Sequence, residues 1–149
     1  MRLALTSDAA FEQHQPRENE AGEECAPHVE CPARIKAIWN LVNPRATELG
    51  LLTVSARSAS DEELLSVHQP SVLQTLQKLE SQGGGWIDGD TYCCSQSLKA
   101  ARLAVGGGLE LLSGIAVGDF QRGFGLVRPP GHHATPFASM GFCLFSNVA

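Results

Sequence analysis

Short apolar runs alternate with longer stretches of helical periodicity along this chain of 149 residues. Residues 2–6, 51–54 and 124–127 are predicted to form strands, because each apolar run is too short for a stable helix. The third run stops at two prolines, and we expect it to be a buried strand. The alternation of strands with helices indicates an α/β sheet that carries helices on its faces.

Two helices are predicted in the first half of the chain. Pro32 opens the first, since its missing N–H has no partner in a first helical turn, and Asn43 before a proline ends it. Ser60 and Glu63 form a capping box that begins the second helix, which continues through Val67. The expected apolar face of the first helix comprises Ile35, Ile38, Trp39 and Val42.

Two more helices are predicted over residues 70–80 and 95–113. Residues 81–85, with three glycines, are expected to form a flexible break that continues as a loop through residue 90. Residues 106–108 place three glycines inside the longer helix, which is tolerated if a neighbouring element packs there at close range. The expected buried side of the longer helix comprises Leu98, Ala101, Ala104, Val105, Leu109 and Leu112.

The remaining segments are a polar loop and an apolar end. Residues 7–27 are polar and rich in helix breakers, and we expect a solvated loop. Residues 142–149 are apolar and look like the opening of a buried helix that stops without a cap. We therefore expect residues 1–149 to be the amino-terminal portion of a larger domain.

The composition narrows the classes of partner. With 11 basic and 16 acidic residues the net charge is −5, which argues against direct nucleic-acid binding. An acidic surface could attract a basic peptide or a polyamine, but on charge alone it does no more than keep the chain soluble. No apolar segment is expected to reach the length of a membrane span, and no membrane partner is predicted. The five cysteines, an odd number without a secretory signal, indicate a reducing compartment.

Two adjacent histidines stand where the chain cannot continue as regular structure. Residues 128–134 read Arg-Pro-Pro-Gly-His-His-Ala and follow the third predicted strand. His132 and His133 therefore lie on a loop at the carboxyl end of that strand, where open α/β sheets bind ligands. Two histidines can divide proton transfer and charge stabilisation, although an isolated pair is more often a solvent-facing turn. Cys25, His28 and Cys31 fit no zinc spacing, and no metal site is predicted from them.

Several motifs occur in the order found in the zinc-dependent histone deacetylases. The histidine loop is followed by Gly141-Phe142-Cys143 and by the ending Phe145-Ser146-Asn147-Val148-Ala149. Upstream, residues 28–35 read His-Val-Glu-Cys-Pro-Ala-Arg-Ile, which resembles the family's first-loop motif, with Val29 and Ala33 departing from its commonest form. The chain resembles this family, and most of all its class II members. The resemblance implies a three-layer arginase/deacetylase-like α/β fold with a mainly parallel sheet, incomplete in this chain.

The resemblance also implies catalytic roles for the two histidines. His133 matches the general base, and also the acid, that acts on zinc-bound water. His132 matches a histidine that mainly supplies electrostatic support.

Four further residues match positions that surround the substrate. Asp90 matches an aspartate that hydrogen-bonds the substrate backbone at the rim of the site. Gly141 and Phe142 match the floor and one aromatic wall of the acyl-lysine tunnel, and Arg34 matches an arginine beside an internal cavity. From the residues alone, Asp90 is nearly as well explained as a turn residue, Phe142 as core, and Arg34 as an exposed helix residue.

The implied function is hydrolysis of acetyl-lysine amides in histone tails or other proteins, with Zn²⁺ as cofactor, in the nucleus, the cytoplasm or both. The family's zinc ligands match positions beyond Ala149, so this chain alone is expected to bind zinc weakly and to be inactive. An acetylpolyamine deacetylase and a non-catalytic, truncated binding module stay open as alternatives.

Overall fold

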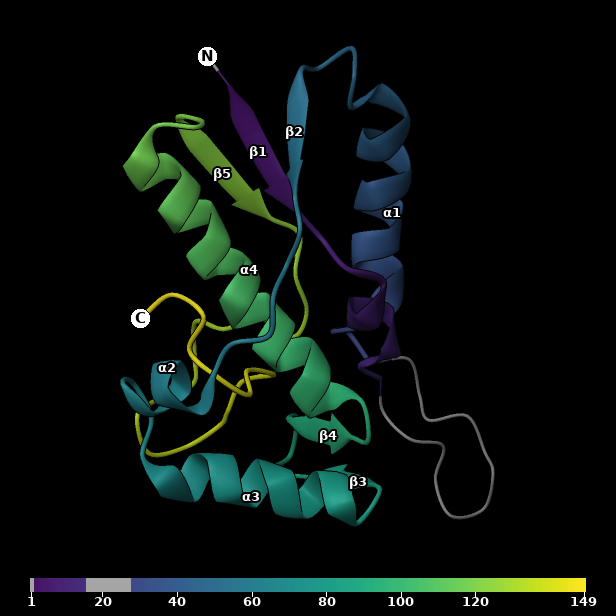
Figure 1. Cartoon of the computed structure of the whole chain (residues 1–149). Helices are drawn as coiled ribbons and strands as arrows, with labels where there is room; N and C mark the ends of the chain where they lie inside the picture. Colours follow the sequence, from purple (N-terminus) through teal and green to yellow (C-terminus); the bar gives the residue numbers. More distant parts are fainter. Residues whose placement is uncertain (1, 16–27) are drawn as a thin grey trace.

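The computed structural model describes residues 2–15 and 28–149. Its sheet has three parallel strands in the order β2-β1-β5, with β1 (Leu3–Thr6) between β2 (Leu51–Val54) and β5 (Arg122–Gly125). The predicted strands at 2–6 and 51–54 are confirmed. The sheet lies at one end of the fold and a two-stranded hairpin lies at the other, with the longest helix running between them (Figure 1).

Helices cover both faces of this sheet, as the alternating pattern predicts. Ala4 and Leu5 point to opposite faces because successive strand residues alternate. Ala4 packs with Leu111 of α4, and Leu5 packs with Ile35 of α1. The helices are α1 (Pro32–Val42), α2 (Asp61–Leu65), α3 (Pro70–Ser81) and α4 (Ser97–Val117), with the 3₁₀ helices η1 (Ala9–Gln13) and η2 (Asn43–Arg45).

The local start signals for α1 and α2 are confirmed. Pro32 is the first residue of α1. At α2 the Ser60 hydroxyl accepts the Glu63 N–H at 3.2 Å, while the Glu63 carboxylate accepts the Ser60 N–H at 2.8 Å. Both helices therefore begin where the sequence places a residue suited to the unpaired first turn.

The helix α4 is longer than expected, and its expected buried side is confirmed at Leu98, Ala101 and Ala104 but not at Leu112. It continues to Val117 and ends at Gly118 in the left-handed conformation, φ 86°. Leu111 is buried and Leu112 is 64% exposed, so the expectation for Leu112 was wrong.

At 21 residues α4 is also long and apolar enough to cross a membrane, which corrects the expectation that no segment reaches that length. Its packing against β1, β5 and α3 is that of a core helix.

Other parts of the chain pack closely against the glycine run inside α4, as expected if three glycines are to be tolerated in a helix. A Cβ built on Gly106 would lie 1.9 Å from the carbonyl oxygen of Arg57, and one on Gly107 would lie 3.1 Å from Thr6 Cγ2. The chain leading from β2 to α2 and the end of β1 therefore approach the α4 backbone directly. Only glycine permits this approach at Gly106.

The expected flexible break at residues 81–85 is partly a strand. β3 (Gly84–Trp86) pairs antiparallel with β4 (Tyr92–Cys94). Gly84 has φ 118°, and a Cβ there would lie 2.5 Å from the Cys93 carbonyl oxygen. The glycines permit a tight strand pairing, and the loop predicted through Asp90 connects the two strands.

Two expectations about the last third of the chain were wrong. The strand β5 begins at Arg122 and is exposed, with Phe124 52% accessible, because it is an edge strand paired only with β1 among the described residues. The buried residue of that run, Leu126, lies just beyond β5. Residues 142–149 form turns and an isolated bridge between Met140 and Cys143, not the start of a helix.

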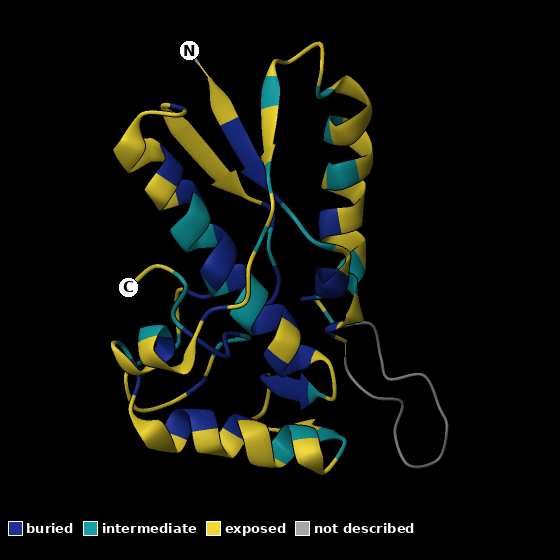
Figure 2. Ribbon diagram, viewed as in Figure 1, coloured by how far each residue is buried: buried dark blue, intermediate teal, exposed yellow. Residues whose placement is uncertain are grey.

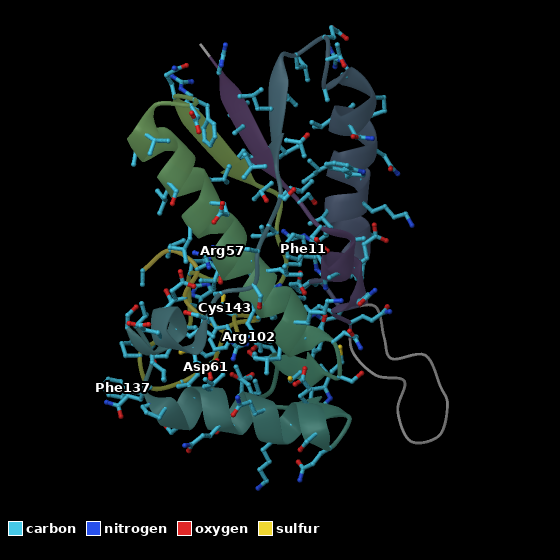
Figure 3. All side chains as sticks on the ribbon, viewed as in Figure 1. Phe11, Arg57, Asp61, Arg102, Phe137 and Cys143 are labelled. Carbon is cyan, nitrogen blue, oxygen red and sulfur yellow. The ribbon has the colours of Figure 1, made fainter. Side chains whose placement is uncertain are left out.

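The core extends from the sheet to the hairpin, so that buried residues fill the middle of the fold (Figure 2). Leu144 and Phe145 are fully buried in it, together with α3 residues such as Leu76 and with Cys93 of β4. Cys143, labelled in Figure 3, is also fully buried. The segment that follows the histidine loop is thus fixed by the core.

Candidate functional site

The histidine loop comprises residues 131–134. A buried ion pair between Arg128 and Glu30 anchors the chain just before this loop. The Arg128 guanidinium donates to the Glu30 carboxylate through Nε and, at 2.7 Å, through Nη2. Its remaining hydrogen bonds reach the carbonyl oxygens of Phe11 (2.7 Å) and His14 (2.6 Å) and the hydroxyl of Tyr92 (3.1 Å). The loop is thereby attached to η1, to the first-loop motif and to β4.

Cys143 and Asn147, which follow the histidine loop in the sequence, support its backbone through hydrogen bonds. The Asn147 N–H donates to the carbonyl oxygen of Gly131 at 2.9 Å. The Cys143 sulfur accepts the backbone N–H groups of His132 and His133, each at 3.4 Å. Cys143 is therefore a buried acceptor that shapes the loop backbone.

The rings of His132 and His133 point outward and lie side by side. Their centroids are 4.3 Å apart and their planes are inclined by 58°. Both residues are exposed, and neither ring hydrogen-bonds to another side chain or backbone group among residues 2–15 and 28–149. The backbone is fixed while the ring nitrogens are available to a ligand.

Gly141 lies directly against His133. It has φ 57°, and a Cβ built there would lie 2.9 Å from His133 Cβ and Cγ. Glycine is therefore required here for two reasons, the left-handed backbone and the close approach.

Replacing Gly141 with alanine should destabilise the fold and displace His133. The left-handed backbone costs about 1–2 kcal/mol for alanine, and the overlap with His133 should add about 1–3 kcal/mol. Gly50 is a matched control, since it has φ 60° and no atom within 4 Å of a built Cβ. Chemical denaturation of Gly141→Ala and Gly50→Ala should therefore show a larger loss for the first. Equal losses would contradict the contact.

The rim of the site is organised by His28, whose contacts the sequence did not reveal. Its Nε2 donates to the Asp90 carbonyl oxygen at 3.1 Å, and its Nδ1 accepts the Glu30 N–H at 3.2 Å. The ring lies edge-on to Phe142 and to Tyr92, with centroids 5.1 and 5.2 Å apart. The only available signal was the position of His28 at the start of the first-loop motif.

Five of the six predicted site residues come together and the sixth, Arg34, does not. Gly141 touches His133, and Phe142, the next residue, is linked to Asp90 through the hydroxyl of Thr91. Arg34 is exposed on α1, and its side chain makes no hydrogen bond or ion pair within the described parts of the chain. Its place beside an internal cavity stays a prediction.

A second histidine missed by sequence reasoning, His14, is buried behind the site. Its Nδ1 lies 2.7 Å from the Ser97 hydroxyl, and its ring stacks on Tyr92 with centroids 4.4 Å apart. Burial, then the positive charge of Arg128, lowers the pKa of His14 from 6.5 to about 3. The folded protein therefore keeps this ring neutral.

The buried neutral ring should make stability fall on mild acidification. Because the folded pKa of His14 is below the unfolded value, its contribution is complete above pH 6.5 and is lost as pH falls towards 3. Burial also lowers the pKa of His68, which acts in the same direction. From pH 7 to pH 5 the free energy of unfolding should drop by about 2 kcal/mol through His14. Denaturation of the parent chain and of His14→Asn at both pH values tests this, and an equally steep loss in His14→Asn would contradict it.

A metal cannot be assigned to the described residues. No group of three or more His, Cys, Asp or Glu side chains in residues 2–15 and 28–149 is placed to hold an ion. Cys25, considered with His28 and Cys31, lies outside the described residues. The residues present do not by themselves fit the Zn²⁺ ion that the resemblance implies.

Comparisons with known proteins agree on one family. Residues 28–149 match the family model described as the histone deacetylase domain. The chain is 41% identical over 128 residues to "Polyamine deacetylase HDAC10" of Homo sapiens, covering 81% of the chain and 19% of that protein. It is 32% identical over 167 residues to "Histone deacetylase HDA1" of Saccharomyces cerevisiae, covering 100% of the chain and 24% of that protein.

A solved structure supports the fold class directly. The "HDA15 HD domain" superposes with a TM-score of 0.88 at 34% identity, covering 99% of this chain and 41% of that one. The expected deacetylase-like α/β fold with a parallel sheet is thereby confirmed. The chain spans about a fifth to a quarter of the two curated relatives and less than half of the solved structure.

Proposed function

Because the chain belongs to the histone deacetylase family, we propose that its histidine loop takes part in hydrolysing the amide of acetyl-lysine in histone tails or other proteins. The observation that carries this proposal is the meeting of His133, Gly141, Phe142 and Asp90 in one cluster. These residues come from three separate stretches of the sequence, and their proximity supports the roles proposed for them.

The chemistry assigned to the histidines is proton transfer at the scissile amide. His133 takes a proton from the attacking water as the new C–O bond forms, then gives it to the amine nitrogen as the C–N bond breaks. The products are acetate and the free lysine amine. His132, 4.3 Å away between ring centroids, stabilises charge that develops beside His133.

Substrate contacts are assigned to the rim. The exposed Asp90 carboxylate would accept N–H groups of the substrate backbone, while Gly141 and the ring of Phe142 would line the acyl-lysine chain. The contact of Gly141 with His133 supports this placement, because it puts the lining residues beside the proposed base. Zinc as cofactor is proposed from family membership alone, as the described residues hold no complete ligand set.

An N-acetylated polyamine is the second candidate substrate, favoured by the 41% identity to a protein named as a polyamine deacetylase. Location in the nucleus, the cytoplasm or both is part of the proposal. It is supported by the free cysteines within residues 2–15 and 28–149, which are Cys31, Cys93, Cys94 and Cys143.

The test uses the full natural chain that contains this sequence, loaded with zinc. The kcat/KM for an acetyl-lysine peptide is compared with that for an N-acetylated polyamine, with Asp90→Asn as the variant. Asp119→Asn, at an exposed position in the turn after α4 and away from the rim, is the control. Higher kcat/KM for the peptide, reduced only by Asp90→Asn, is expected. A preference for the polyamine selects the second candidate, and peptide binding without turnover selects the binding module.

A further inference from the structure

Thr91 occupies a central position in the rim that no predicted role explains. It precedes β4 and its side chain is completely buried, at 0% exposure. Its hydroxyl accepts the backbone N–H of Phe142 at 3.0 Å and donates to the Asp90 carboxylate, Oδ1, at 2.9 Å. One hydroxyl thus connects two groups proposed to contact the substrate.

The backbone N–H of Phe142 needs a hydrogen-bond acceptor, and the Thr91 hydroxyl provides it. Among the described residues, Phe142 is the one non-glycine residue with positive φ, at 68°. This left-handed backbone is disfavoured for a residue with a side chain, so the surrounding contacts must fix it. The Thr91 hydroxyl supplies such a contact, and it receives an N–H that would otherwise face the interior without a partner.

Hydrogen bonds fix the backbone of Asp90, so that its carboxylate is the part whose direction is still to be set. The Asp88 carboxylate accepts the N–H groups of Asp90 (3.0 Å) and Thr91 (2.7 Å), and His28 donates to the Asp90 carbonyl oxygen. With the backbone fixed on both sides, the Thr91 hydroxyl is the group that sets the direction of the exposed Asp90 carboxylate.

We infer that Thr91 is a positioning residue that sets the Asp90 carboxylate and the Phe142 turn relative to each other. The inference rests on the proposed function for the roles of Asp90 and Phe142, but not for the hydrogen bonds of Thr91. Without the hydroxyl, the carboxylate loses a donor and the Phe142 N–H loses its acceptor. Both changes should weaken substrate binding more than they slow proton transfer at His133.

The first experiment measures amide hydrogen exchange in the chain of 149 residues. Thr91→Val keeps the shape and removes the hydroxyl, Thr91→Ser keeps the hydroxyl, and Thr75→Val is a matched control on α3, where the hydroxyl donates to the Ser71 carbonyl oxygen. Exchange at the Phe142 amide should become about tenfold faster in Thr91→Val only. If Thr91→Val does not fold, Thr91→Ala serves as the second variant without a hydroxyl. Unchanged exchange at Phe142 would overturn the inference.

The second experiment separates binding from chemistry in the zinc-loaded full natural chain. Thr91→Val should raise KM for an acetyl-lysine peptide about tenfold while kcat stays within about twofold, and Thr91→Ser should restore KM. A loss in kcat with KM unchanged, or equal effects of valine and serine, would overturn the positioning role. If the unsubstituted protein has no deacetylase activity, the proposed function fails, while the exchange result still decides the role of the hydroxyl.

Discussion

Replacing His133 with alanine should slow the chemical step by about 10²–10⁴-fold, and more than replacing His132 does. The reason is the division of roles, since the proposed base transfers the proton while its neighbour acts through its field. The pair is suited to the comparison because both residues are exposed and both backbone N–H groups donate to the same Cys143 sulfur at 3.4 Å. Removing either ring should leave the loop backbone equally supported.

The measurement is kcat for an acetyl-lysine peptide in the zinc-loaded full natural chain, with zinc content determined for each variant. His132→Ala and His133→Ala serve as controls for one another. Equal and small losses would rule out the assignment of the base to His133.

Replacing Glu30 with alanine should destabilise the fold by about 3–5 kcal/mol, because it leaves a buried cation without its partner. Glu30 is 1% exposed and Arg128 2%, and the two are joined by paired hydrogen bonds. Without Glu30 the charged Arg128 guanidinium has no carboxylate partner, so either water must enter the interior beside it or the histidine loop must move. Chemical denaturation of the chain measures the loss.

Glu48→Ala is the matched control for this prediction. Glu48 accepts from Arg45 at 3.4 Å on the surface, and exposed pairs of this kind contribute about 0–1 kcal/mol. A loss in Glu30→Ala no larger than that in Glu48→Ala would show that the buried pair is not what holds the histidine loop.

Elements with local signals could be predicted from the sequence. Pro32 at the start of α1 and the Ser60–Glu63 capping box at α2 act within one helical turn, and the structure confirms both. The strands at 2–6 and 51–54 are short apolar runs whose pairing partners need not be known to identify them.

Elements that depend on distant partners could not be predicted in this way. The composition of the glycines that begin β3 predicts a break in regular structure. They form a strand only because Gly84 can pass close to the backbone of Cys93 in β4. Likewise the run at 124–127 is apolar in sequence, yet β5, which contains its first two residues, is exposed because it lies at the edge of the sheet, a position that no local pattern contains.

The residues of the candidate site also fall into those that the local sequence predicts and those that only distant contacts bring together. The order of motifs predicts His133, Gly141 and Phe142 together, since they lie within ten residues of one another in the sequence. The contact of His28 with Asp90, and the burial of His14 behind Tyr92, join residues about 60 and 80 positions apart and appear only in the folded chain.

The anchoring of Arg128 has a consequence for the order in which the protein acquires its shape. Its partners Glu30, His14 and Phe11 are separated from it by 98, 114 and 117 residues. Contacts across such separations form only after nearly the whole chain has been closed into a loop, which costs entropy before it yields stability. Helices with their own caps can form early, whereas the histidine loop has no local means of reaching its final geometry. The geometry of the histidine loop is thus set by contacts that span most of the sequence. A nascent chain that has just emerged as far as the histidines must still fold back onto its first thirty residues before the two rings are set in place.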